Sequence, residues 1–136
     1  MKRVLALALV LAGCGGDSTP EGPPPPLPSA EGFYALSTVD GEPLPVPFGP
    51  STAFLDFALM SLLGNGDLLS AATISDQEQQ TIFQKEGTWS QNGSTVFLDW
   101  DAPDCDDTAV LSGNRPSLLL SFDDCATGSP TVWERQ

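Results

Sequence analysis

The sequence contains no histidine. This absence excludes histidine-based catalytic triads, histidine general bases and histidine metal ligands. No G-x-S-x-G nucleophile element occurs either. Acidic residues could in principle serve glycoside hydrolysis, but nothing in the pattern marks a cleft between two carboxylates. We therefore expect a protein that is not an enzyme, with no catalytic residues and no cofactor.

Basic residues are also scarce. The chain has 5 Lys and Arg against 18 Asp and Glu, which gives a net charge of −13. Such a chain is repelled by the phosphates of nucleic acids. This balance predicts no nucleic-acid partner, and leaves cations or basic proteins as the partners that charge would favour.

The sequence lacks an apolar run long enough for a transmembrane helix, which needs about 20 residues. The apolar stretch from Val4 to Ala12 follows Lys2 and Arg3 and is typical of a secretory signal. Its end, Leu11-Ala12-Gly13-Cys14, resembles the lipobox of bacterial lipoproteins. The resemblance implies a signal peptide over residues 1–13, cleavage after Gly13, and diacylglycerol and palmitate-type acylation at Cys14.

Residues 14–30 would then form a lipid-anchored tether, because six prolines and several glycines leave little to pack. A proline-reading partner is the alternative use for this segment. Loss of residues 1–13 would leave Lys85, Arg115 and Arg135 against 18 acidic residues, a net charge of −15. We expect a cell-envelope protein attached to the membrane through the lipid on Cys14. Gly15 follows this cysteine in place of aspartate, which by the same resemblance favours the outer over the inner membrane.

Residues 31–136 are enough for one folded domain. Short apolar runs alternate with turn residues throughout this region, which predicts strands near 32–39, 68–74, 94–100, 108–111, 118–122 and 131–135. Residues 81–90 predict either one strand bulged at Gly87 or two strands. Four prolines between 43 and 50 predict no regular structure there.

The almost wholly apolar block from Ala53 to Leu63 is ambiguous. Ser51 could cap a helix and Gly64 could end one. We favour a buried strand, because the apolar residues cover every face of a helix and the turn Gly64-Asn65-Gly66-Asp67 follows directly. Together the segments predict an all-β fold, an antiparallel up-and-down meander closing into a barrel of roughly eight strands.

Cys105 and Cys125 are an even pair once Cys14 is lipidated, and an exported protein meets an oxidising environment. Arg115 is equidistant from both cysteines, so a hairpin centred there would place them opposite each other. The sequence predicts a disulfide between them. The same hairpin would bring together seven acidic residues, which suit either a solvated face, a basic protein partner or calcium: Asp99, Asp101, Asp104, Asp106, Asp107, Asp123 and Asp124.

Several short motifs together resemble the lipocalin-like domains of bacterial lipoproteins. They are Gly32-Phe33-Tyr34-Ala35-Leu36, Val39-Asp40-Gly41-Glu42-Pro43-Leu44-Pro45, Leu62-Leu63-Gly64-Asn65-Gly66-Asp67, Gly87-Thr88-Trp89, Asn92-Gly93 and Trp133-Glu134-Arg135. The resemblance implies a lipocalin-like barrel over 31–136 in which Arg135 packs against Phe33 or Tyr34 and closes the barrel base.

For function, we expect a monomer with a non-catalytic binding role, whose ligand is a small apolar molecule or an envelope protein. The alternative is an acidic calcium- or protein-binding module with a filled barrel and no ligand. The Phe, Tyr and Trp residues in the strands of the domain would fill the core in the second case and line a cavity in the first.

Overall fold

The computed structural model describes residues 16, 22–23 and 25–136. The signal peptide expected over 1–13 and the lipidation expected at Cys14 lie outside these residues. Among the described residues there is no helix, and so none that could cross a membrane. The prediction of an all-β fold is confirmed.

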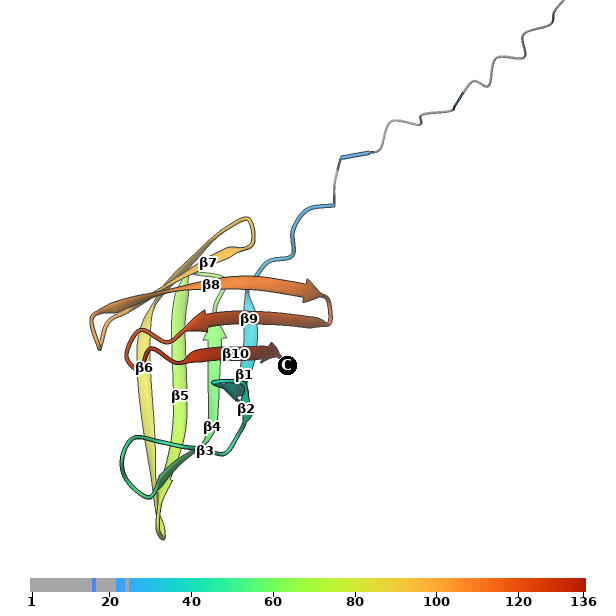
Figure 1. Ribbon diagram of the computed structural model, residues 1–136. Helices are drawn as coiled ribbons and strands as arrows, with labels where there is room; N and C mark the ends of the chain where they lie inside the picture. The colour runs from blue at the N-terminus through green and yellow to red at the C-terminus, as the bar shows by residue number, and fades with distance from the viewer. Residues whose placement is uncertain (1–15, 17–21, 24) are drawn as a thin grey trace, which may run out of the picture.

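The described residues form ten strands in one antiparallel sheet. They are β1 (Gly32–Val39), β2 (Glu42–Pro43), β3 (Val46–Pro47), β4 (Ala53–Leu62), β5 (Asp67–Asp76), β6 (Gln79–Asn92), β7 (Thr95–Trp100), β8 (Cys105–Asn114), β9 (Ser117–Asp123) and β10 (Pro130–Arg135). Each strand from β4 to β10 pairs with the next, and β1 pairs with both β10 and β4. The sheet therefore closes into an eight-stranded barrel, as predicted (Figure 1).

The block 53–63 is a strand, so the helix alternative is wrong. β4 pairs with β5 from Ala53 to Leu62, with a bulge between Leu55 and Phe57. Ala58, Met60 and Leu62 point into the barrel and are buried, whereas Phe57 and Leu59 point outward and are 48% and 40% exposed. The block is apolar on both faces because this part of the outer surface is apolar too.

Two further expectations need correction. Residues 43–50 were expected to lack regular structure, yet they contribute the short strands β2 and β3. Proline is tolerated there because both strands are edge additions, β2 on β1 and β3 on β4. Residues 81–90 belong to the single long strand β6, whose pairing with β5 runs without a register shift, so Gly87 is not a bulge.

The core lies inside the barrel, where alternate residues of the strands meet. Tyr34, Met60, Leu62, Leu68, Val96, Leu98, Leu118 and Leu120 are almost completely buried. Burying each such side chain contributes about 1.5–3 kcal/mol. These side chains make the barrel a packed core.

The two ends of the folded domain are adjacent. The N–H of Gln136 donates to the carbonyl of Phe33 at 2.9 Å, just beyond the pairing of β1 with β10. Figure 1 shows residues 25–30 leaving from the same end of the barrel, while the lower halves of β4, β5 and β6 extend away from it.

Candidate binding surface on the outer wall

A hollow of about 330 Å³ lies across the neighbouring strands β6, β7 and β8. Two rows of outward-facing residues form its floor. The strand register places Thr88, Asp99 and Asp106 in one row, and Ser90, Phe97 and Thr108 in the next. We call these six residues the outer groove. Because side chains alternate along a strand, the residues between them point into the core.

The first row is acidic. Asp99 and Asp106 lie directly opposite each other on β7 and β8. A hydrogen bond between the two carboxyl groups, together with repulsion from Asp99, raises the pKa of Asp106. Like charges placed opposite each other on a sheet disfavour the ionised form of the pair. A cationic group from a partner would relieve this repulsion.

The second row is apolar at its centre. Phe97 is 44% exposed although it stands in the middle of a strand. The outward-facing row beside it contains Val110, which lies opposite Thr95 and is 54% exposed. The outer groove thus offers an acidic pair beside an exposed aromatic ring, which suits a side chain with an apolar stem and a basic head.

A polar cluster lies behind this wall, inside the barrel. The buried carboxylate of Asp107 accepts hydrogen bonds from the indole N–H of Trp100 at 2.8 Å and from the backbone N–H of Cys125 at 2.7 Å. Burial raises the pKa of Asp107, and these two hydrogen bonds partly oppose the rise. Lys85 lies 4.4 Å from the centre of the Trp100 ring and 3.7 Å from Asp124.

This cluster fixes the loop that carries the disulfide. Cys105 and Cys125 are bonded, with their Cα atoms 6.0 Å apart. The predicted disulfide is therefore confirmed. The hairpin of β8 and β9 turns at Arg115 and Pro116, close to the predicted centre. Asp107 and the disulfide thus both attach Cys125, in the loop after β9, to β8.

The acidic residues do not gather at one point, as the hairpin argument had suggested. Asp99 and Asp106 face outward, Asp107 faces the core, and Asp124 pairs with Lys85. Asp101 and Asp104 are exposed around the β7–β8 turn, and Asp123 is exposed at the end of β9. In the part of the chain that the structure describes, no group of three or more acidic or cysteine side chains could hold a metal ion.

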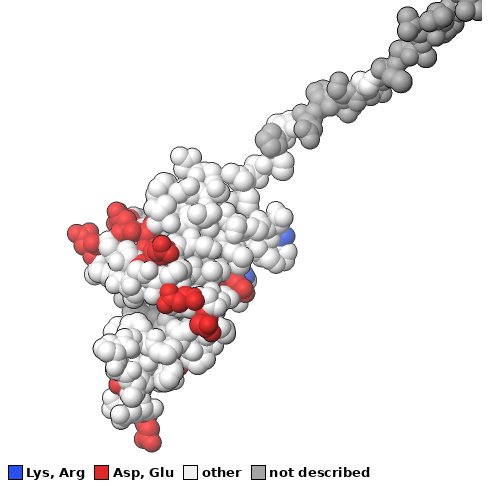
Figure 2. Space-filling model, in the orientation of Figure 1, with Lys and Arg blue, Asp and Glu red and all other residues white. Residues whose placement is uncertain are grey.

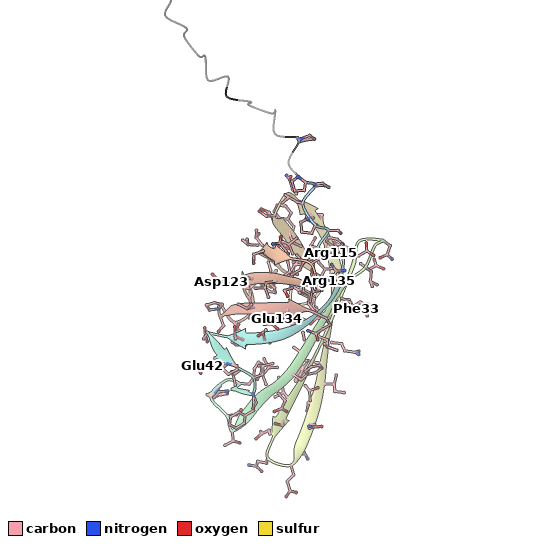
Figure 3. The ribbon with its side chains drawn as sticks, turned by 90° about the vertical axis from the view of Figure 1, so that its right-hand side faces the viewer. Phe33, Glu42, Arg115, Asp123, Glu134 and Arg135 are labelled. Carbon is pink, nitrogen blue, oxygen red and sulfur yellow. A yellow bond between two sulfur atoms is a disulfide. The ribbon has the colours of Figure 1, made fainter. Side chains whose placement is uncertain are left out.

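Charge is unevenly distributed over the domain. On the face shown in Figure 2, most acidic side chains lie at the left and lower parts of the barrel, and the few basic atoms in view lie at the right, one of them beside an acidic group. In Figure 3, Arg115 and Arg135 lie near one another on the same side as Phe33. A basic partner would be attracted to the acidic part of the surface.

Arg135 lies opposite Tyr34 in the pairing of β1 with β10. Its guanidinium packs on Gly32, where an added Cβ would lie 2.9 Å from Cζ. The hydroxyl of Tyr34 is buried and donates to the carbonyl of Ala30 at 2.7 Å. Phe33 points away from the barrel and is 62% exposed. Of the two expected partners, Arg135 is thus placed with Tyr34.

The outer groove had no signal in the sequence beyond its acidic residues. Its six members come from three strands, and only the register of those strands brings them together. The inward position of Asp107 did have a signal, because it shares alternation with the apolar residues Ala109 and Leu111. A search of protein-family models and of curated proteins found no match to this chain.

Proposed function

We propose that this chain is a cell-envelope lipoprotein, anchored in the outer membrane through lipid on Cys14, and that its barrel has a non-catalytic role in binding an envelope protein. The lipobox supports the anchor, and the proline-rich residues 15–30 support a spacer between anchor and barrel. The domain would act as a monomer and present its outer wall to the partner.

The observation that carries the binding role is the contrast between the interior and the outer wall. An eight-stranded barrel has room for side chains or for one small ligand. Here large side chains fill the interior, nine of them less than 2% exposed. The hollow across β6, β7 and β8 lies on the outside instead. This contrast favours a protein partner over a small apolar ligand held inside.

Photo-crosslinking in cells tests the partner. A photoreactive phenylalanine analogue replaces Phe97 in the outer groove, and in a control chain it replaces Phe33, an exposed phenylalanine on β1. We expect a protein adduct from position 97 and little from position 33. Equal adducts from both positions, or none from either, would contradict a partner site at the outer groove.

Native mass spectrometry separates the two kinds of ligand. The chain is extracted from the envelope in mild detergent and weighed intact. We expect no additional organic mass beyond the lipid anchor. A stoichiometric organic ligand that survives purification would favour the carrier role instead, and calcium that is lost on chelation would favour an acidic calcium module.

The anchor is tested separately with labelled palmitate. The wild-type chain should incorporate the label and fractionate with the outer membrane, and Cys14→Ser should do neither. Incorporation that persists in Cys14→Ser would show that acylation occurs elsewhere. Ser18→Ala, a change in the tether, is the matched control and should behave like wild type.

A further inference from the structure

β6 is longer than β7, the strand that pairs with it on one side. It pairs with β5 from Gln79 to Thr88, but with β7 only from Gly87 to Asn92. Among the described residues no strand pairs with the other side of 79–85, which we call the free edge. Figure 1 shows this lower half of β6 at the side of the sheet, below the point where β7 ends.

The backbone of the free edge is oriented for pairing. The carbonyl of Glu86 faces the β7 side, because it accepts a hydrogen bond from Asp101 N–H at 2.9 Å. In an antiparallel strand, residues two apart direct their N–H and C=O groups the same way. Gln80, Ile82 and Gln84 therefore present their backbone groups to solvent along this edge.

Residues 79–84 of the free edge carry no side chain that blocks pairing, and Lys85 at its end is directed to Trp100 and Asp124. Native edge strands are usually protected by charge, proline, a bulge or a cover. Residues 79–84 contain no charge and no proline, and their register with β5 is unbroken. Ile82 and Phe83 are 67% and 52% exposed, on opposite faces of the strand. On the outer face Ile82 continues a row with Thr73 and Phe57.

Charge argues against a second copy of this chain as the occupant. Antiparallel self-pairing centred on Ile82 would bring Glu78, in the turn before β6, close to Glu86, just past the free edge, at both ends of the new ladder. Like charges directly opposite each other are destabilising, and the two domains are strongly acidic throughout. A strand with basic residues at those two positions would instead be attracted to both ends.

We propose that the free edge of β6 binds an extended segment of a partner protein by strand addition. The segment carries an apolar residue opposite Ile82 and basic residues four positions away on each side, near Glu78 and Glu86, which flank the free edge. Backbone hydrogen bonds give the affinity, and the apolar and basic positions give the specificity. This inference rests on the proposed function, protein binding, and assigns it a second contact on β6, distinct from the outer groove.

The test uses the full chain in detergent and synthetic peptides of nine residues. The parent peptide has lysine at both ends, isoleucine at the centre, and alternating threonine and valine between. One derivative is N-methylated at positions 3, 5 and 7, whose N–H groups would face β6. A second is N-methylated at positions 4 and 6, whose N–H groups would face away. Binding is measured by fluorescence anisotropy.

We expect the parent and the second derivative to bind, and the first derivative to bind roughly tenfold more weakly or worse, because three hydrogen bonds are lost. Ile82→Pro, which removes a free-edge N–H that β5 does not use, should weaken the parent peptide similarly. Ile82→Thr keeps that N–H and should lose less. No binding of the parent peptide, or equal binding of both derivatives, overturns the proposal.

Sedimentation of the chain alone supplies a further check. Self-association that Ile82→Pro abolishes would identify a second copy as the occupant and would also overturn the proposal. If the crosslinks from position 97 are found but the peptides do not bind, the proposed function stands and strand addition at β6 is wrong. If the peptides bind and no crosslinks form, the outer groove is not a partner site, and the free edge of β6 is the site of protein binding.

Discussion

Trp100 and Asp107 are seven residues apart in the chain and meet inside the barrel, where the indole N–H donates to a carboxylate oxygen at 2.8 Å. The other oxygen of the same carboxylate receives the N–H of Cys125 at 2.7 Å. A single carboxylate therefore satisfies two N–H donors, from two separate segments.

Replacing Asp107 tests this arrangement. Asp107→Ala leaves the Trp100 and Cys125 donors without their acceptor. An unsatisfied buried donor costs about 1–3 kcal/mol, so we expect the free energy of unfolding in urea to fall by roughly that amount or more. Asp106→Ala, the exposed neighbour, is the control and should not destabilise. Equal stability of the two variants would contradict the structural role of Asp107.

The pair Asp99 and Asp106 predicts a pH dependence. The raised pKa of Asp106 means that the folded state holds a proton more tightly than the unfolded state does. The contribution of this protonation to the stability of the fold is complete below 3.8, the usual pKa of aspartate, and is lost as pH rises through the raised pKa of Asp106. We therefore expect Asp99→Asn to raise the melting temperature at about pH 7 and to change it little at about pH 3.

An exposed acid elsewhere separates this pair from a general effect of charge. Asp123→Asn removes the same charge at the end of β9, away from the outer groove. Its effect on the melting temperature at neutral pH should be smaller than that of Asp99→Asn. Identical pH profiles for the two variants would show that net charge alone matters.

Removing the disulfide should weaken the domain without changing its topology. The bond closes a loop between residues 105 and 125, and a loop of this length contributes roughly 3 kcal/mol by restricting the unfolded chain. We expect the double variant Cys105→Ser and Cys125→Ser to lose about that much in urea unfolding. Its far-ultraviolet circular dichroism should match that of wild type, because the Asp107 contacts remain.

Gly87 tests how closely β6 and β7 approach. A Cβ at this position would overlap the backbone of Asp99, which no side-chain movement relieves. We expect Gly87→Ala to cost about 1–3 kcal/mol, as overpacking of a core does. Gly22→Ala in the tether meets open space and should be neutral. A neutral Gly87→Ala would indicate that the two strands separate easily.

The order and type of the strands could be predicted from the sequence because the turns are explicit. Gly64-Asn65-Gly66-Asp67 and Asn92-Gly93 each end one strand and start the next. The block 53–63 was harder to interpret, because both faces of β4 are apolar and alternation is hidden. β2 and β3 could not be predicted, because proline-containing edge pairs depend on neighbours that the local pattern does not show.

The candidate sites follow a different logic. The disulfide could be predicted from chain symmetry about Arg115, because pairing in a hairpin is local. The outer groove could not, since it depends on the register of β6, β7 and β8 together. The end of β7 at Trp100 could be predicted, but the free edge also depends on how far the pairing of β6 with β5 continues past that point, which the local pattern does not show.

The entry of the tether at β1 has a mechanical consequence. β1 is held between β10 and β4, and its first residues lie at the tether end of the barrel, while the free edge of β6 lies toward the other end (Figure 1). Tension between the proposed membrane anchor and the proposed partner at β6 would pull β1 along its own length. The hydrogen bonds of the two ladders beside β1 would then be loaded together, in shear. A force that peeled β1 away sideways would instead break these hydrogen bonds one at a time.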